Sequence, residues 1–218
     1  PAITMDSDDT ISFWKDLGQK WLIKEQYFKP YPVCRWAQAP IEAVLNLKFK
    51  HNISSKDVKN IEIHTFHEAI RLAISEPKTT EEAQYSTSYP CAVALVNGDV
   101  GVKEVSENSF RDPETLRISK SLKMMENDYC NSQFPSQRFA SAKIELNNGN
   151  ILETGFVNPR WTAENPPRVS ELKNKFFKLS NPIIGENNSK NIELAVNNLK
   201  TNAELNDLTS LLYEPINN

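Results

Sequence analysis

Two prolines, Pro30 and Pro32, stand two residues apart in a segment that also carries Lys29 and Arg35. Each proline fixes its own φ at about −65° and moves the preceding residue away from helical geometry. We therefore expect this segment to be a stiff, extended connector. Because a stiff backbone holds its side chains at set positions, the two cations could grip a ligand that carries carboxylates.

The composition is that of a globular chain on the polar side. Of the 218 residues, 39% are hydrophobic and 24% are charged, and the formal net charge is −3. This acidic balance gives no general attraction for nucleic acid or for an anionic membrane surface. No apolar run approaches the roughly 20 residues of a membrane span. We expect one domain or two small ones, in a cytoplasmic protein.

The chain has three cysteines and three histidines, at Cys34, Cys91, Cys130, His51, His64 and His67. The cysteines are too few and too scattered for a disulfide framework, and none forms a C-x-x-C pair. Iron–sulfur clusters use closely spaced thiolates, and zinc sites use characteristic histidine spacings, so we expect neither here. We predict no metal and no cofactor.

Periodicity predicts helices and strands in alternation in the first two thirds of the chain. A helix is expected from Pro40 to about Asn52, because proline suits a first helical turn. Residues 61–65 alternate as in a half-buried strand. Thr79 and Glu82 could form a capping box that starts a second helix, and Pro90 should break that helix and let it restart.

Further along, Asp112-Pro113 should open a helix that runs to about Glu126. Asn148-Gly149 stands between two alternating runs and predicts a β-hairpin. A proline-rich loop follows, and then three amphipathic patterns in residues 169–212. Each of these helices has an apolar stripe that must pack on something.

Several short blocks of the sequence occur in an order that is typical of one protein family. The blocks are Leu17-Gly18 with Trp21, Lys29-Pro30-Tyr31-Pro32-Val33-Cys34-Arg35, Pro40-Ile41-Glu42-Ala43, Glu82-Ala83-Gln84-Tyr85-Ser86 with Tyr89, and Glu171-Leu172-Lys173-Asn174-Lys175-Phe176. Together they resemble the MmgE/PrpD family, which includes 2-methylcitrate dehydratases, cis-aconitate decarboxylases and an iminodisuccinate epimerase.

The resemblance implies an α+β fold. Residues 25–165 would form a central lid-like domain with a β-sheet and helices. Residues 1–24, with a short helix over 11–17, and the C-terminal helices of 166–218 would belong to an all-helical domain. The chain looks like the C-terminal half of a family member. We therefore expect a homodimer or a partner chain that carries the N-terminal half and covers the helices.

The resemblance also points to candidate catalytic residues. Lys29 matches an active-site lysine and could hold a substrate carboxylate or stabilise an enolate-like charge. The alternative is a solvated surface lysine. Cys34 and Gln38 fall where relatives carry histidines. A thiol with a lowered pKa could act as a base, although free cysteine is more often an inert buried residue.

Three further residues are candidates for substrate binding: Arg35, Tyr31 and Arg160. The planar fork of Arg35 suits a carboxylate, although an ion pair with Glu42 would explain the residue equally well. Arg160 lies in the proline-rich loop and could supply another cation. Tyr89 matches a tyrosine of the family's site and would face Lys29 across a cleft, where its phenol could donate to an oxyanion. A buried tyrosine satisfied by backbone groups is the alternative.

Two functions follow from these residues. The first is a cofactor-free lyase that dehydrates a small hydroxy-di- or tricarboxylate resembling 2-methylcitrate, with epimerisation or another isomerisation of a dicarboxylate as the alternative. The second is a truncated paralogue without catalysis that binds a partner or a carboxylate ligand. The missing helical half and the histidine replacements favour the second reading, and enzyme activity of the chain alone stays open.

Overall fold

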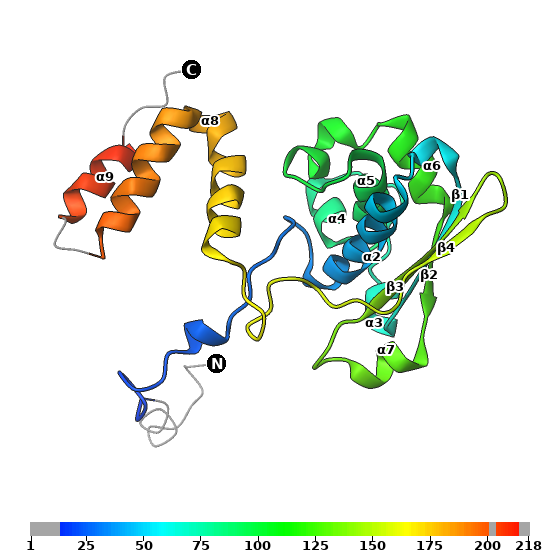
Figure 1. The fold of residues 1–218 in the computed structure, drawn as a ribbon, viewed down its shortest axis with the longest axis horizontal. Coiled ribbons are helices and arrows are strands. Elements are labelled where there is room, and N and C mark those ends of the chain that lie inside the picture. The colour runs from blue at the N-terminus through cyan, green and yellow to red at the C-terminus, as the bar shows by residue number, and fades with distance from the viewer. Residues whose placement is uncertain (1–13, 201–203, 214–218) are drawn as a thin grey trace.

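A mixed β-sheet forms one side of the larger lobe in the computed structural model, which describes residues 14–200 and 204–213 (Figure 1). Within these residues the strand order is β2-β1-β3-β4, with β1 and β2 parallel and the other neighbours antiparallel. The strands are β1 (Val58–Thr65), β2 (Leu122–Glu126), β3 (Ala140–Leu146) and β4 (Ile151–Glu153). Parallel pairing of β1 with β2 requires a long crossover, and the mainly helical segment of residues 66–121 supplies it.

One face of this sheet is covered by helices and the other is polar. Ile61 and Ile63 on β1 are fully buried, whereas Glu62 and His64 between them are partly exposed. The helices on the covered face are α2 (Arg35–His51), α5 (Tyr89–Asn97) and α6 (Pro113–Ser121). The strand predicted over residues 61–65 and the hairpin at Asn148-Gly149 are both confirmed.

Helix α2 lies at the centre of the core, and most of its first thirteen residues are buried. The helix was expected to begin at Pro40, but it begins at Arg35 and contains Pro40 in its interior. Proline there removes one backbone donor. The predicted end is confirmed, because Asn52 adopts a left-handed conformation with φ 50° directly after the last helical residue.

The predicted break at Pro90 is confirmed. Helix α4 (Thr80–Tyr85) ends before it, and α5 restarts with Pro90 in its first turn. At the start of α4, the Thr79 hydroxyl accepts a hydrogen bond from the Glu82 amide at 3.2 Å. The Glu82 carboxylate accepts from the amide of Lys78 at 2.7 Å instead of returning to Thr79.

The helix expected over residues 113–126 is only partly right. Helix α6 ends at Ser121, and residues 122–126 form β2. Pairing with β1 decides this, since Leu122 lies opposite Ile61 and its side chain is buried in the core. The remaining short elements are η2 (Leu22–Glu25), η3 (Ser55–Asp57), α3 (His67–Ile70), η4 (Lys103–Val105), η5 (Glu107–Ser109) and α7 (Asp128–Gln133).

The N-terminal segment differs from the expectation. The helix expected over residues 11–17 lies partly outside the described residues, and residues 14–19 form turns. Leu22–Glu25 form a short 3-10 helix after these turns.

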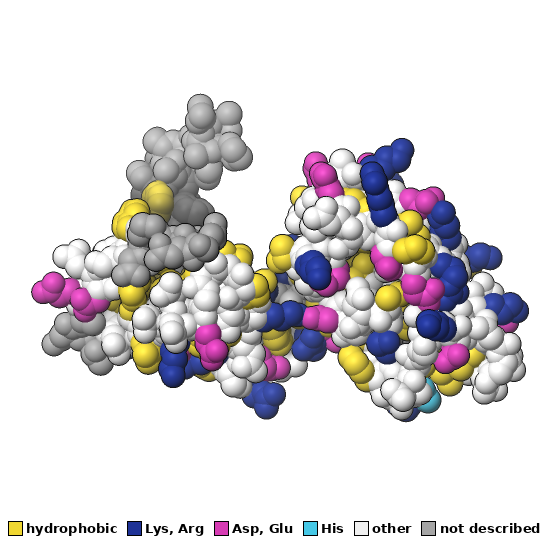
Figure 2. Space-filling model, turned by 90° about the horizontal axis from the view of Figure 1, so that it is seen from above, with side chains coloured by type: hydrophobic (Ala, Val, Ile, Leu, Met, Phe, Trp, Pro, Cys, Tyr) yellow, Lys and Arg dark blue, Asp and Glu magenta, His cyan; other side chains and the backbone are white. Residues whose placement is uncertain are grey.

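The C-terminal helices form a separate lobe, which Figure 1 shows beside the sheet domain. Helix α8 (Val169–Asn198) is broken at Gly185, where φ is 80°, and α9 (Leu205–Tyr213) packs against it. The amphipathic patterns are confirmed as helices. The fold is α+β, with helices that flank the sheet domain. Several of their apolar side chains are exposed, and hydrophobic atoms are visible on this lobe in Figure 2.

Across the described residues, no helix is both long enough and apolar enough to span a membrane.

Candidate functional site

A pocket of about 340 Å³ lies where the double-proline segment meets α4 and α8. We call it the Lys29 pocket. Its lining consists of Lys29, Tyr31, Pro32, Val33, Cys34, Arg35, Gln84, Tyr85 and Lys175. Residues 146 positions apart in the sequence thus meet at one cavity, and three of the lining residues carry a cationic side chain.

Gln38 fixes the double-proline segment against α2. Its side-chain oxygen accepts from the amide of Tyr31 at 3.3 Å, and its nitrogen donates to the carbonyls of Tyr31 at 3.1 Å and Val33 at 3.2 Å. Gln38 itself is fully buried. The prolines leave the segment without regular backbone hydrogen bonds. The side-chain amide of Gln38 therefore supplies the hydrogen bonds that a neighbouring strand would otherwise make. The amide is a structural group, placed where family members were expected to carry a histidine.

Lys175 on α8 lies beside Lys29, and sequence reasoning did not select it. Its ammonium group donates a hydrogen bond to the Lys29 carbonyl. Burial lowers the pKa of Lys175, and the positive charges of Lys29 and Lys178 lower it further. Two lysines held close together favour an anionic ligand between them, since that ligand would relieve their repulsion.

Cys34 is half-buried at the edge of the same pocket, directly before α2. Its amide donates to the carbonyl of Gln84 at 2.7 Å, which ties the segment to α4. The other two cysteines are buried, and burial raises the pKa of both Cys91 and Cys130. Cys34 is therefore the cysteine with access to a ligand in the pocket.

Tyr31 and Arg160 are joined through Glu42 on α2. The Tyr31 hydroxyl donates to the Glu42 carboxylate at 2.9 Å, and the Arg160 Nε donates to the same oxygen at 2.5 Å. Arg160 also donates to the Tyr31 hydroxyl at 3.0 Å. Burial disfavours the charge on Arg160, but Glu42 outweighs that effect and raises the pKa of Arg160. Glu42 had been considered as a partner for Arg35; in the structure it pairs with Arg160 instead.

Arg35 begins α2 and holds two segments together. Its Nη1 donates to the carbonyls of Phe28 at 3.4 Å and Arg160 at 3.2 Å, and its guanidinium lies 4.0 Å from the ring centre of Tyr27. The residue is 7% exposed. Arg35 borders the Lys29 pocket with part of its donors already used.

Tyr89 lies elsewhere in the molecule. It lines a different pocket with Glu104, Ser109 and Asp112, and its hydroxyl donates to the carbonyls of Glu104 and Ser109, each at 3.4 Å. Burial, together with the nearby charges of Asp112 and Glu104, raises the pKa of Tyr89 to about 12. The structure does not bring Tyr89 to Lys29, in contrast to the cleft expected between them.

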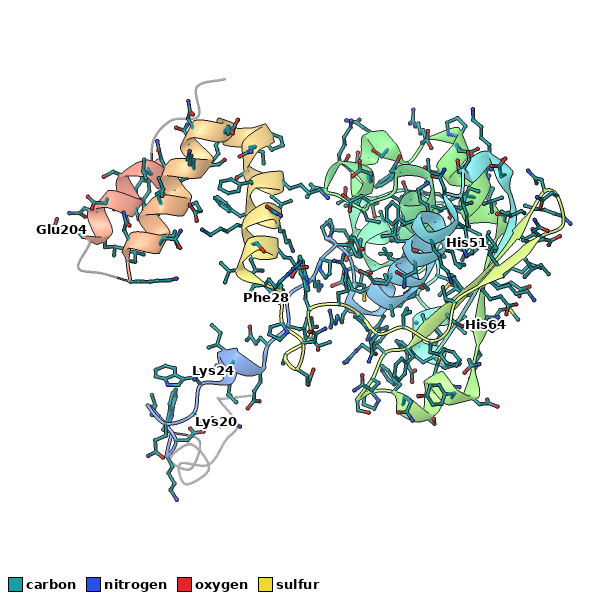
Figure 3. The ribbon with its side chains drawn as sticks, in the orientation of Figure 1. Lys20, Lys24, Phe28, His51, His64 and Glu204 are labelled. Atoms are coloured by element: carbon teal, nitrogen blue, oxygen red, sulfur yellow. The ribbon has the colours of Figure 1, made fainter. Side chains whose placement is uncertain are left out.

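The histidines lie away from the Lys29 pocket. Figure 3 labels His51 at the end of α2 and His64 on the sheet, both well separated from Phe28 beside the pocket. The ring of His67 interacts with the Glu126 carboxylate at 3.2 Å. In the described parts of the chain, no three histidine, cysteine or acidic side chains gather as metal ligands would.

A comparison with protein families bears directly on this geometry. The family model of the MmgE/PrpD C-terminal domain matches residues 31–201, which is well over half of the chain. The chain belongs to the MmgE/PrpD family. The match includes most of the Lys29 pocket and all of the sheet. A search of curated proteins gave no significant match to this MmgE/PrpD chain.

Of the residues predicted for the site, the structure brings together Lys29, Tyr31, Cys34 and Arg35 at one pocket. Arg160 is linked to them through Tyr31, and Tyr89 is separate. Lys175 was missed because its helix was judged by its apolar periodicity alone. The signal that could have found it is the block of residues 171–176, which had been noted only as part of the family resemblance.

Proposed function

We propose that this MmgE/PrpD chain forms part of a cofactor-free lyase that acts on a small hydroxy-di- or tricarboxylate. The observation that carries the proposal is the meeting of Lys29, Lys175 and Arg35 at one pocket. Several cations gathered at one pocket are suited to hold the carboxylates of such a substrate.

The same cations support a specific reaction type. Removal of a proton from the carbon next to a carboxylate creates an enediolate-like charge, and Lys29 and Lys175 are the residues proposed to stabilise it. The β-hydroxyl then takes up the abstracted proton and leaves as water, which completes a dehydration, whereas return of the proton to the opposite face of the carbon gives epimerisation. Dehydration is the reaction we propose, with epimerisation of a dicarboxylate as the alternative outcome of the same first step.

Cys34 is the proposed proton acceptor among the residues of the pocket. A thiol serves as a base only as its thiolate, and Cys34 is the cysteine that borders the pocket. Tyr31 and Arg160 are proposed to act on the substrate only indirectly, because Glu42 engages both of them. A catalytic part for Tyr89 would require its phenol to leave the Glu104 and Ser109 carbonyls.

The test is a thermal-stabilisation screen of the full chain with a panel of hydroxy-di- and tricarboxylates. At least one acid should raise the unfolding temperature, and Lys29→Ala should remove the shift. Lys123→Ala, which changes an exposed lysine on β2, is the matched control and should respond like the unmodified chain. The proposal fails if no acid has an effect or if Lys29→Ala responds normally.

A second candidate function is a binding module without catalysis. The buried, fully engaged amide of Gln38 favours it, since this group cannot exchange a proton as a histidine would. Proton NMR in D2O separates the two functions. An enzyme, once any partner it requires is present, exchanges the proton next to the carboxylate for deuterium, whereas a binding module leaves that signal intact.

We also propose that the exposed apolar faces of the helical lobe are covered by helices of the all-helical domain, from a second copy or a partner chain. Leu179, Ile183 and Leu212 are among the exposed apolar residues that support this. Light scattering at increasing concentration tests for the copy. A chain that stays monomeric at all concentrations and binds no helical partner would contradict the proposal.

A further inference from the structure

The sequence contains two Asn-Gly steps, and the structure places them in different settings. One is Asn97-Gly98 at the end of α5, and the other is Asn148-Gly149 in the turn between β3 and β4. Because glycine lacks a Cβ, its backbone nitrogen can approach the side chain of the asparagine before it. An asparagine in this arrangement can lose its amide group through a cyclic imide. The local structure therefore decides which of the two steps reacts.

The Asn148-Gly149 step lies at an exposed hairpin tip. Residues 147–150 are all exposed, and Figure 1 shows this turn projecting from the edge of the sheet domain. A Cβ at Gly149 would meet no atom within 4 Å. The Gly149 amide donates to the Leu146 carbonyl at 2.9 Å, which closes the turn. Opening this hydrogen bond disturbs only the tip, where local opening costs little free energy.

The Asn148 side chain lies along the backbone that follows it. Its Oδ1 accepts a hydrogen bond from the Asn150 amide at 3.0 Å. Since Gly149 stands between these two residues, the contact keeps the side-chain carbonyl beside the Gly149 nitrogen. The N–H group of Asn150 also polarises this carbonyl, which favours attack by a nucleophile.

The Asn97-Gly98 step is held by packed structure instead. Asn97 is the last residue of α5, and most residues of this helix are buried in the core. The Gly98 amide donates to the Ala94 carbonyl at 2.8 Å. A Cβ at Gly98 would lie 3.5 Å from the Lys48 side chain and 3.6 Å from the Phe49 ring. Movement of the Gly98 nitrogen towards the Asn97 side chain would therefore disturb the packed end of a core helix.

We propose that Asn148 is a site of spontaneous deamidation in the folded chain. The Gly149 nitrogen attacks Cγ of Asn148 and forms a C–N bond, and the side-chain amide nitrogen leaves as ammonia with the proton from Gly149. Water then opens the cyclic imide. Cleavage of the bond between Cγ and the Gly149 nitrogen gives aspartate. Cleavage of the bond from the main-chain carbonyl gives isoaspartate, in which the chain runs through the former side chain.

Either product alters the turn. Both add a negative charge, and isoaspartate also lengthens the main chain by one carbon atom. The turn sets the register in which Glu145 on β3 lies opposite Ile151 on β4. Isoaspartate should therefore weaken the pairing of β3 with β4 more than aspartate does.

Incubation of the full chain at neutral and at mildly alkaline pH, followed by peptide mapping with mass spectrometry, tests the proposal. Asn148 should react at least roughly tenfold faster than Asn97, which corresponds to a difference of about 1.4 kcal/mol in activation free energy. The rate should rise with pH, because a base must remove the amide proton. A protein isoaspartate methyltransferase, which methylates the isoaspartyl carboxylate, supplies a label for that product.

The same incubation in denaturant is the control for structure, since both Asn-Gly steps are then unrestrained and should react at similar rates. Asn148→Gln should abolish the label at the turn, because glutamine would have to close a larger ring, and Asn97→Gln should leave that label unchanged. The proposal is overturned if Asn148 stays intact in the folded chain, or if Asn97 reacts there as fast as Asn148.

Asn148→Asp separates the two effects on stability, because it carries the charge without the longer main chain. This variant should unfold at a higher temperature than the isolated isoaspartate form. Equal unfolding temperatures would overturn the effect on strand pairing.

Discussion

Glu42 on α2 and Arg160 in the loop before α8 form an ion pair across 118 residues of sequence, with 2.5 Å between the carboxylate oxygen and Nε. The Glu42 side chain is 12% exposed and the Arg160 side chain 46%. Through Tyr31, the pair fastens the double-proline segment to the helix that carries Arg35 and Gln38. The shape of the Lys29 pocket depends on this link.

We predict that Arg160→Gln lowers the free energy of unfolding by about 1–3 kcal/mol, because it leaves the nearly buried Glu42 carboxylate short of a partner. Arg168→Gln is the matched control, since the Arg168 side chain is 81% exposed in its pair with Glu171. The control should change stability by less than about 0.5 kcal/mol. Denaturant unfolding measures both variants. Equal losses of unfolding free energy in the two variants would mean that the ion pair of Glu42 with Arg160 stabilises the fold no more than an exposed pair does.

We predict that Tyr89→Phe reduces stability by about 0.5–1.5 kcal/mol and leaves acid binding at the Lys29 pocket unchanged. The lost group is a hydroxyl that donates only to backbone carbonyls. Thermal shifts with and without the best ligand measure both effects. A folded Tyr89→Phe protein that no longer binds the acid would show that the phenol reaches the ligand after all.

We predict that Glu114 contributes to acid stability. Its hydrogen bond to Arg117, followed by one to Ser55, lowers the pKa of Glu114 from 4.5 to about 2. A carboxylate with a lowered pKa in the folded state stabilises the protein above pH 4.5, and this contribution is lost as the pH falls towards about 2. The stability of Glu114→Gln should therefore fall less steeply across that window.

Unfolding midpoints measured at several pH values follow this effect. Arg117→Gln is the companion variant, because it removes the main hydrogen-bond partner of Glu114. It should flatten the same part of the pH profile. A profile as steep as that of the unmodified chain in both variants would exclude the Glu114 contact as the source.

We predict that iodoacetamide modifies Cys34 before the other two cysteines in the folded chain. Cys34 is half-buried at a pocket, whereas Cys91 and Cys130 are buried with raised pKa values. Peptide mapping by mass spectrometry identifies the order, and a bound polycarboxylate should slow the reaction at Cys34. The Cys34→Ser variant should lack the fast phase of iodoacetamide modification. Early modification of Cys91 would contradict the burial described for it.

The sequence predicted those elements that local chemistry determines. The Thr79 cap, the restart at Pro90 and the Asn148-Gly149 turn each depend on a few neighbouring residues. Residues 122–126 were wrongly predicted as helix, because the local sequence is compatible both with a continued helix and with a strand. The choice was made by pairing with β1, which lies about 60 residues earlier in the chain.

The site was predictable in part for the same reason. The double-proline segment identified Lys29, Cys34 and Arg35 as one group, and the structure places them at one pocket. Local sequence could not show that α8 brings Lys175 to the same place. Nor could it show that the Tyr89 hydroxyl donates to the carbonyls of Glu104 and Ser109. A family resemblance indicates which position in the sequence corresponds to a site residue, but it does not give the contacts of that residue in this chain.

The most direct test is the dissociation constant of the full chain for the most stabilising polycarboxylate, measured by isothermal calorimetry for the unmodified chain, Lys29→Ala, Lys175→Ala and Lys123→Ala. The account predicts that each of the first two variants weakens binding by roughly tenfold or more, as expected for loss of a charged contact, while Lys123→Ala binds normally. Unchanged affinity in both Lys29→Ala and Lys175→Ala would contradict the proposed polycarboxylate site.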